Sequence, residues 1–325
     1  MAKNKMRRGE PPIRQSGVGA QATKPLESTR PTRIDATIAE IYPNMSGGIA
    51  RINLPTGDYT YRAIPFYITS SAEIVGKTTE VVGIGHVVNT ANVSEYISNV
   101  RLMMNGAVMQ ELTTDELVIR NQYSVLDMSA GMVGFWFPGT RFYQDARHRD
   151  AFALGTERAY GLKLELQQTA AFDTGTMELH CAPLFVRAPK ATAFTYTTER
   201  ISNTFSAIGK HTFTDLPDGD AIAQIWMIAD GVTHLKMEVD GKTLIDCNRI
   251  EYNNMLIEAG RDISAIGDDW LIDMHWDGRP RSLAPLDLPA EVRRGAKIKV
   301  ELTTTQANTE VQFLVLHSGL YRDVR

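Results

Sequence analysis

The sequence has few of the features that mark disulfide-stapled, secreted or membrane-spanning proteins. Its 325 residues include two cysteines, Cys181 and Cys247, which lie in different halves of the chain and match neither a disulfide framework nor a zinc site. We expect both to be reduced and buried. No apolar run approaches the ~20 residues that a membrane-spanning helix needs. The basic start is followed by Gly9-Glu10-Pro11-Pro12 rather than an apolar segment, which argues against a secretory signal peptide.

Signatures of catalysis and cofactor binding are also scarce. The seven histidines include no His-x-His pair, which a metal-dependent enzyme of the cupin type needs. His180 and His275 are therefore interpreted as strand residues of the fold. Gly83-Ile84-Gly85 lacks the third glycine and the helix of a dinucleotide site, and the sequence has neither a phosphate-binding loop nor a Gly-x-Ser-x-Gly elbow. The sequence predicts no enzyme, no cofactor and no metal site.

Local clusters of acidic or aromatic side chains are interpreted as parts of the fold. Acids gather in a turn, at Asp215, Asp218 and Asp220, and around Trp270, at Asp268, Asp269 and Asp273. The first group lacks the spacing of a calcium-binding helix–loop–helix, and nothing gives the second the defined separation of a glycosidase pair. The aromatic cluster consists of Phe135, Trp136, Phe137, Phe142 and Tyr143. Alternation along a strand sends about half of such a cluster into a core, so we expect core and subunit contacts.

The beginning of the chain differs in charge and composition from the rest. Residues 1–35 contain eight Lys or Arg and three acids, a net charge of +5, whereas the whole chain carries −4. This segment is rich in Pro, Gly, Ser, Thr and Gln and has almost no apolar periodicity, which predicts an arm rather than a packed element. Its partners could be anionic lipid, packaged nucleic acid or neighbouring subunits, or it could be a solubilising tail without a partner. The cations that we single out are Lys3, Lys5, Arg7, Arg8 and Arg14.

From Ile34 onward, short alternating or apolar runs are separated by turn residues, and long helical patterns are absent. This punctuation predicts β-strands. In the first half the expected strands are Ile49–Leu54, Tyr59–Ile68, Glu80–Val88, Val100–Met104, Val133–Phe137, Leu162–Gln167 and Met177–Val186. The same pattern resumes from about Ala193, with Phe205–Phe213, Ala223–Ala229, His234–Val239, Trp270–His275, Lys297–Thr303 and Glu310–Leu316.

The two halves share ordered landmarks, which indicates a duplicated domain. A strand ends in the hairpin turn Asn105-Gly106 in the first half and in Asp240-Gly241 in the second. The capping boxes Thr113-x-x-Glu116 and Asn248-x-x-Glu251 follow these turns at the same distance along the chain. Each capping box opens a short helix, predicted over Asp115–Tyr123 and Arg249–Ala259, with Gly260 ending the second.

Three further pairs of segments occur in the same order in both halves. They are Leu54–Asp58 with Leu216–Asp220, Phe135–Gly139 with Met274–Gly278, and Leu162–Leu166 with Ile298–Leu302. The members of the first pair lie farther apart along the chain than those of the other pairs. The first half therefore carries about 27 additional residues near Ser70–Glu95, which we expect to form a projecting loop or hairpin.

Each half therefore offers about eight short strands and one inserted helix without strand–helix alternation, which is typical of a two-sheet sandwich. The eight-stranded jelly roll matches the strand count, and an immunoglobulin-like sandwich remains open for either half. We predict an all-β chain with a basic N-terminal arm over residues 1–35, a first sandwich over 36–188 and a second over 189–325.

The sequence resembles the double jelly-roll major capsid proteins of tailless, internal-membrane bacteriophages, the lineage that includes tectiviruses and the adenovirus hexon. The resemblance spans about residues 40–320. It lies in Leu54–Tyr61, Ile97–Gly106, Asn121–Phe137, Leu154-Gly155-Thr156 and Ile272–Gly278. It implies two tandem eight-stranded jelly rolls and a homotrimer whose six jelly rolls form a pseudo-hexagonal capsomer.

The resemblance further implies a structural protein of the virion of an icosahedral, membrane-containing DNA phage, made and assembled in the host cytoplasm. Its expected partners are other copies of itself, vertex (penton) and minor capsid proteins, and the internal membrane through the arm, without sequence-specific nucleic acid. The alternative is a viral spike or receptor- or carbohydrate-binding β-sandwich, which would need an exposed aromatic or calcium-assisted sugar site. A two-domain cupin or a glycosidase would instead need a bound metal or an acid pair.

Overall fold

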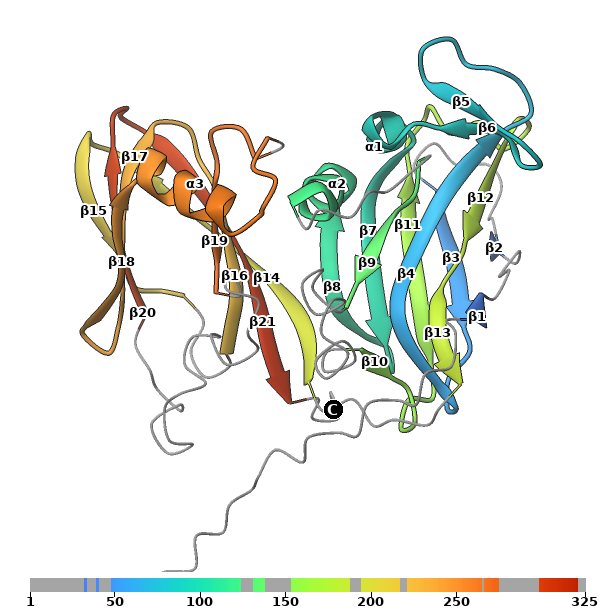
Figure 1. The fold of residues 1–325 in the computed structure, drawn as a ribbon, viewed down its shortest axis with the longest axis horizontal. Coiled ribbons are helices and arrows are strands. Elements are labelled where there is room, and N and C mark those ends of the chain that lie inside the picture. The colour runs from blue at the N-terminus through green and yellow to red at the C-terminus, as the bar shows by residue number, and fades with distance from the viewer. Residues whose placement is uncertain are drawn as a thin grey trace, which may run out of the picture.

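The computed structural model describes residues 32–33, 39–40, 48–123, 131–137, 153–187, 194–216, 221–264, 266–274 and 298–320 (Figure 1). The strands of the first half are β1 (Thr32–Arg33), β2 (Ala39–Glu40), β3 (Ile49–Leu54), β4 (Tyr59–Ser70), β5 (Thr78–Val81), β6 (Gly85–Val88), β7 (Ile97–Met104), β8 (Ala107–Thr113), β9 (Val133–Trp136), β10 (Leu154–Gly155), β11 (Leu162–Gln168), β12 (Met177–Cys181) and β13 (Leu184–Arg187). Those of the second half are β14 (Phe194–Phe205), β15 (Gly209–Phe213), β16 (Ala221–Ile228), β17 (Val232–Val239), β18 (Lys242–Asn248), β19 (Trp270–Asp273), β20 (Ile298–Thr304) and β21 (Thr309–Leu320). The helices are η1 (Thr90–Asn92), α1 (Val93–Tyr96), α2 (Thr114–Tyr123) and α3 (Arg249–Glu258). Within these ranges no helix combines the length and the hydropathy needed to cross a bilayer.

The second half is an eight-stranded jelly roll. One sheet has the order β14–β21–β16–β19 and the other β15–β20–β17–β18, all antiparallel. Counted along this half, the first, eighth, third and sixth strands form one sheet, and the second, seventh, fourth and fifth form the other. That interleaved order defines the jelly roll.

The first half repeats the same order with additional short strands. β1, β13, β4 and β9 take the places of the first, eighth, third and sixth strands, and β3, β11, β7 and β8 form the opposing sheet, which β2 extends. The predicted all-β double jelly roll is therefore confirmed. No sheet of the described chain combines strands from both halves. The exact boundary between residues 188 and 189 lies outside the described residues and stays a prediction.

Alternation along the strands places one apolar face of each sheet inside its sandwich. In β20, Ile298, Val300 and Leu302 are buried, while Lys299 and Glu301 between them point outward. Phe213 of β15 and Phe313 of β21 come from opposing sheets and stack with ring centroids 4.5 Å apart, joining the two layers.

The duplicated landmarks adopt the same local structure in both rolls. The left-handed φ angles of Asn105 (54°) and Asp240 (49°), each followed by a glycine of positive φ, confirm the two hairpin turns. Both capping boxes form: Thr113 Oγ1 accepts from the Glu116 N–H at 3.2 Å and Asn248 Oδ1 from the Glu251 N–H at 3.0 Å, with each glutamate accepting in return from the cap residue's N–H. The segments from β7 to α2 and from β17 to α3 are thus equivalent in order, spacing and backbone conformation.

Three predicted strands are wrong in extent because turns interrupt them. Glu80–Val88 is the hairpin β5–β6, since Gly83 and Gly85 have φ angles of +82° and +101°. Phe205–Phe213 contains the end of β14 and all of β15, and Met177–Val186 divides into β12 and β13. The β5–β6 hairpin projects from the end of the first roll (Figure 1), which confirms the expected insertion.

The predicted pairing of Phe135–Gly139 with Met274–Gly278 is wrong by two positions. β9 begins at Val133 and its equivalent β19 at Trp270, so Phe135 corresponds to Ile272 and not to Met274. The backbone hydrogen bonds confirm this register. The Phe137 N–H donates to the Arg62 carbonyl oxygen on β4, and the Met274 N–H donates to the Ala223 carbonyl oxygen on β16, the strand equivalent to β4.

Candidate functional site: the junction between the jelly rolls

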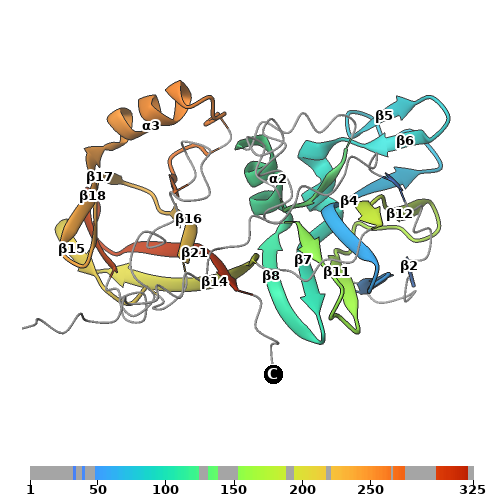
Figure 2. The same ribbon diagram turned by 60° about the horizontal axis from the view of Figure 1, so that its bottom comes forward.

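The two rolls meet through different surfaces. In Figures 1 and 2, β8 and α2 of the first roll face the sheet of the second roll that contains β14, β21, β16 and β19. The β7–β8 hairpin turn places β8 at the edge of its sheet, and the capping box starts α2 directly after β8. Local sequence signals therefore position the part of the first roll that makes the contact. The second roll contributes the outer face of its sheet, opposite to its own core. The contact is therefore heterologous.

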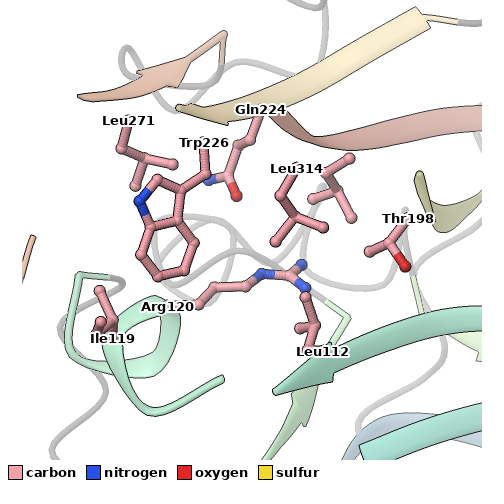
Figure 3. A pocket seen from close by; sticks show the side chains of 9 residues that line it. Leu112, Ile119, Arg120, Thr198, Gln224, Trp226, Leu271 and Leu314 are labelled. Atoms are coloured by element: carbon pink, nitrogen blue, oxygen red, sulfur yellow. The ribbon is translucent and has the colours of Figure 1, made fainter. Parts of the chain in front are cut away.

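The centre of the junction is apolar and nearly filled (Figure 3). A residual cavity of about 20 Å³, room for about one water molecule, remains between the rolls. The first roll lines it with Leu112, Ile119 and Arg120, and the second roll with Thr198, Gln224, Trp226, Leu271, Leu314 and Leu316. Leu314 and Leu316 alternate with the core residues Phe313 and Val315, so β21 is buried on both faces. Side chains of both rolls thus pack against each other at this centre, whereas a larger hollow of about 390 Å³ lies between Glu111, Thr113 and Arg200 at the rim.

Arg120 of α2 extends into this centre, beneath Trp226 (Figure 3). Its guanidinium donates to Gln110 Oε1 at 3.0 Å. Loss of solvation lowers the pKa of Arg120 to about 10, an effect that the nearby Tyr196 and Asp273 partly oppose. Burial also raises the pKa of Tyr196 strongly. The junction thus holds a cation in an environment that disfavours charge.

Asp273, at the end of β19, is the polar centre of the contact. Its fully buried carboxylate pairs with Arg261 at 2.9 Å and accepts from the hydroxyl of Tyr123, on α2 of the first roll, also at 2.9 Å. The Arg261 guanidinium lies 5.3 Å from the centroid of the Tyr123 ring, and the Asp273 N–H donates to the Tyr252 hydroxyl at 3.0 Å. Burial, and then the charge of Asp273, raise the pKa of Tyr123 well above its usual value.

The other two acids near Trp270 have separate structural partners. Asp269 accepts from the Trp226 indole N–H at 3.1 Å and from the Ala229 N–H at 3.2 Å, and burial raises its pKa. Asp268 is exposed and pairs with Arg249 at 2.7 Å. The three carboxylates are thus distributed over an exposed ion pair, a strand connection and the junction. This supports their interpretation as parts of the fold.

The rim of the junction carries a second ion pair. Arg200 of β14 donates to both carboxylate oxygens of Glu116 at 2.6 Å, and Glu116 is also the residue that closes the capping box of α2. Beside it, the Glu111 N–H of β8 donates to Thr198 Oγ1 of β14 at 2.8 Å. Charge-assisted and backbone hydrogen bonds therefore fix β14 against both β8 and α2.

The structure describes only some of the residues that were selected from the sequence. Lys3, Lys5, Arg7, Arg8 and Arg14 lie outside the described residues, as do Phe142, Tyr143, His275, Asp218 and Asp220. Phe135 and Phe137 are core residues and Trp136 is half-buried, while Cys181 is buried and Cys247 only half-buried. His180 is a strand residue that stacks on Tyr67 and hydrogen-bonds Thr69. In the described part of the chain, His, Cys, Asp and Glu side chains form no group of three or more that could hold a metal ion.

Sequence reasoning did not find the junction, although one signal of it exists. The runs around Trp226 and Leu314 are continuously apolar rather than alternating, a pattern that indicates strands buried on both faces. Such a pattern predicts a covered outer sheet. It does not identify the element that covers it.

Comparison with solved structures places this architecture in a known fold. No family model matches the sequence, and no curated protein matches it. The structure is similar to the major capsid protein P2 of bacteriophage PM2, with a TM-score of 0.71 and 19% identity over 90% of this chain and 99% of that one. It is also similar to the major capsid protein of Sulfolobus turreted icosahedral virus (TM-score 0.55, 12% identity, 89% and 97% covered) and to that of Faustovirus (0.51, 7%, 90% and 90%). The fold is therefore the double jelly roll that these capsid proteins share.

Proposed function

We propose that this chain is the major capsid protein of an icosahedral virus and that it forms homotrimeric, pseudo-hexagonal capsomers. One observation carries the proposal: two jelly rolls of the same strand order are joined by a packed junction, in an architecture that matches the PM2 capsid protein over 99% of that chain. Similarity that covers 90% of this chain and 99% of that one supports a shared role in a shell.

The geometry explains why such a chain suits a shell. Two similar domains on each chain and a three-fold axis produce six similar lateral faces, so one gene product can occupy hexagonal positions in a lattice. Five-fold positions then need another protein, so the proposed partners are vertex and minor capsid proteins as well as further copies of this chain. The proposed location is the virion, after assembly in the host cytoplasm.

The first experiment measures the oligomeric state and shape of the purified chain. Light scattering coupled to gel filtration is expected to give a mass three times the 36.1 kDa of one chain. Negative-stain electron micrographs are expected to show flat, six-sided particles. A monomer at all accessible concentrations would overturn the capsid proposal.

The arm belongs to the same proposal. The positive charge over residues 1–35 is suited to anionic lipid headgroups at the inner side of a membrane-containing phage capsid, where each cation contributes ~1 kcal/mol that is lost as salt rises. Deletion of residues 1–31, which keeps β1 (Thr32–Arg33) and its pairing with β13, is expected to leave trimers intact and to abolish salt-sensitive binding to anionic vesicles. The control replaces Lys3, Lys5, Arg7, Arg8 and Arg14 with Gln, and it should lose the same binding. Wild-type vesicle binding by either variant would contradict the role of the arm.

A further inference from the structure

Arg120 differs from the other arginines of the junction in its partners. Arg200 and Arg261 each form an ion pair with a buried carboxylate, at 2.6 Å and 2.9 Å. The acceptor that Arg120 has in the described part of the chain is Gln110 Oε1, a neutral amide oxygen at 3.0 Å. A guanidinium carries five N–H donors and a full positive charge, and one amide oxygen satisfies neither completely. This cation therefore has no counter-charge in contact with it among the described residues.

The second roll shows that the jelly roll itself does not require this polar pair. The equivalents of Gln110 and Arg120 are Ile245 and Met255, which occupy the same places in the β17–β18 pairing and in α3. Both are apolar and pack against the core. Exchanging buried charged groups for apolar residues of similar volume is often neutral or stabilising. The polar pair is thus a feature of the roll whose helix enters the junction, which points to a role there other than packing.

The cavity beside Arg120 has a size that suits one small ion. Its volume of about 20 Å³ lies between α2 and the sheet of the second roll, which adds the polar side chains of Thr198 and Gln224 to a mostly apolar lining (Figure 3). A monatomic anion is only slightly larger than the water molecule that such a volume holds. Apolar surroundings strengthen the attraction between an anion and the guanidinium. Next to Arg120, the buried Gln110 Nε2 has no hydrogen-bond partner in the described chain and adds a second free donor.

We infer that the junction binds a monovalent, monatomic anion, chloride in ordinary saline, against the Arg120 guanidinium in the cavity between the two rolls. Side chains of both rolls line this cavity, so only the docked arrangement of the rolls completes the site. A ligand that binds the folded chain and not the unfolded one stabilises the folded chain by mass action. Chloride therefore stabilises the junction. The inference is independent of the proposed capsid function, because the whole site lies within one chain.

The direct test locates the ion in crystals of the wild-type chain. Bromide replaces chloride in halide sites and scatters X-rays anomalously, so crystals soaked in sodium bromide are expected to show an anomalous peak beside the Arg120 guanidinium, between α2 and β16. Bromide peaks at the protein surface serve as the internal control for the soak. A data set with surface peaks and none in the cavity would overturn the inference and would leave a water molecule as the occupant.

The second test measures unfolding in chloride and in gluconate at equal ionic strength, because gluconate is too large for the cavity. Replacing chloride with gluconate is expected to raise the unfolding equilibrium constant of the wild type about tenfold when chloride is at about ten times its dissociation constant. The double variant Gln110→Ile, Arg120→Met carries the pair that the second roll has at these positions, so it should fold and unfold equally in both salts. Arg249→Gln, which removes an exposed ion pair on α3, is the matched control and should keep the wild-type difference.

The two readouts together decide the inference. A wild-type chain of equal stability in both salts overturns it even if bromide is seen in the cavity, because that result means binding at crystal concentration only. A chloride effect that persists in the double variant assigns the effect to another site and also overturns the inference. If the double variant does not fold, the bromide peak in the wild type and the salt comparison of the wild type with Arg249→Gln still decide whether chloride binds in the cavity and stabilises the chain.

Discussion

At the scale of single residues, Asp273 connects the two rolls through a buried hydrogen bond. Its buried carboxylate receives Arg261 from its own roll and the Tyr123 hydroxyl from the other. Burying an ion pair contributes little net stability, because desolvation offsets the attraction, but removing one partner leaves an uncompensated charge. The link to the first roll is made by Tyr123, whose hydroxyl donates to Asp273 and whose ring lies beside the Arg261 guanidinium.

Asp273→Asn is expected to lower the free energy of unfolding by about 3 kcal/mol, because the buried Arg261 loses its counter-charge while the size of the side chain is kept. Urea denaturation followed by tryptophan fluorescence measures the change. The matched control is Asp268→Asn, whose exposed pair with Arg249 should contribute less than ~1 kcal/mol. Equal effects of the two substitutions would show that the buried pair has no special role.

At the scale of elements, β9 and the central strand β4 of the first roll approach each other closely at Gly134. A Cβ added at Gly134 would lie 2.3 Å from Pro65 Cα and 2.5 Å from the Ile64 carbonyl oxygen, distances that real side chains do not show. The contact is with backbone, so a rotamer change cannot relieve it. Glycine at this position lets the sixth strand of the roll pair with β4.

Gly134→Ala is therefore expected to destabilise the protein by at least ~2 kcal/mol, since β9 must move away from β4. Gly161→Ala is the matched control: nothing lies within 4 Å of its added Cβ, and stability should change by less than ~0.5 kcal/mol. Thermal unfolding of both variants in parallel measures the difference. Near-identical midpoints would contradict the close approach.

At this scale, features encoded within a few residues could be predicted from the sequence, and features that depend on distant residues could not. Hairpin turns and capping boxes are encoded within a few residues, so Asn105-Gly106, Asp240-Gly241 and both helix starts could be predicted. The division of Phe205–Phe213 depends on a single glycine of positive φ, Gly209, which a propensity for β-structure does not resolve. The junction depends on contacts such as Arg200 with Glu116, which are distant in the sequence, so no local pattern contains them.

At the scale of the whole molecule, several buried phenols make the protein less stable at high pH. Burial raises the pKa of Tyr61, Tyr123, Tyr196 and Tyr252, and it raises the pKa of the Cys181 thiol to about 12. These groups are neutral in the fold, so their stabilising contribution is complete below the ordinary pKa of each group and is lost as pH rises above it. Arg120 has the opposite effect on the pH dependence of stability, because burial lowers its pKa to about 10. It is one group against five.

The protein is therefore expected to unfold in alkali, with stability falling from about pH 9 upward. Loss of structure in circular dichroism should coincide with the late part of the rise in tyrosinate absorbance, because exposed phenols such as Tyr160 ionise first and the buried ones ionise only as they become exposed. Tyr196→Phe should move the midpoint to higher pH, and Tyr160→Phe, which removes an exposed phenol, should not. Ionisation of the buried tyrosines together with the exposed ones, before any loss of structure, would contradict this prediction.

The β5–β6 hairpin stands on one roll of each chain and has no counterpart among the described strands of the other. A hexagonal block of three chains would thus carry three crests at alternate corners, and turning it by one sixth of a revolution would exchange crested and bare corners. Neighbouring blocks would then have two distinguishable rotational settings. Any contact between blocks that involves the β5–β6 hairpins would favour one of these two settings. In the proposed trimer, this one insertion would therefore be enough to distinguish the two orientations of a block in its lattice.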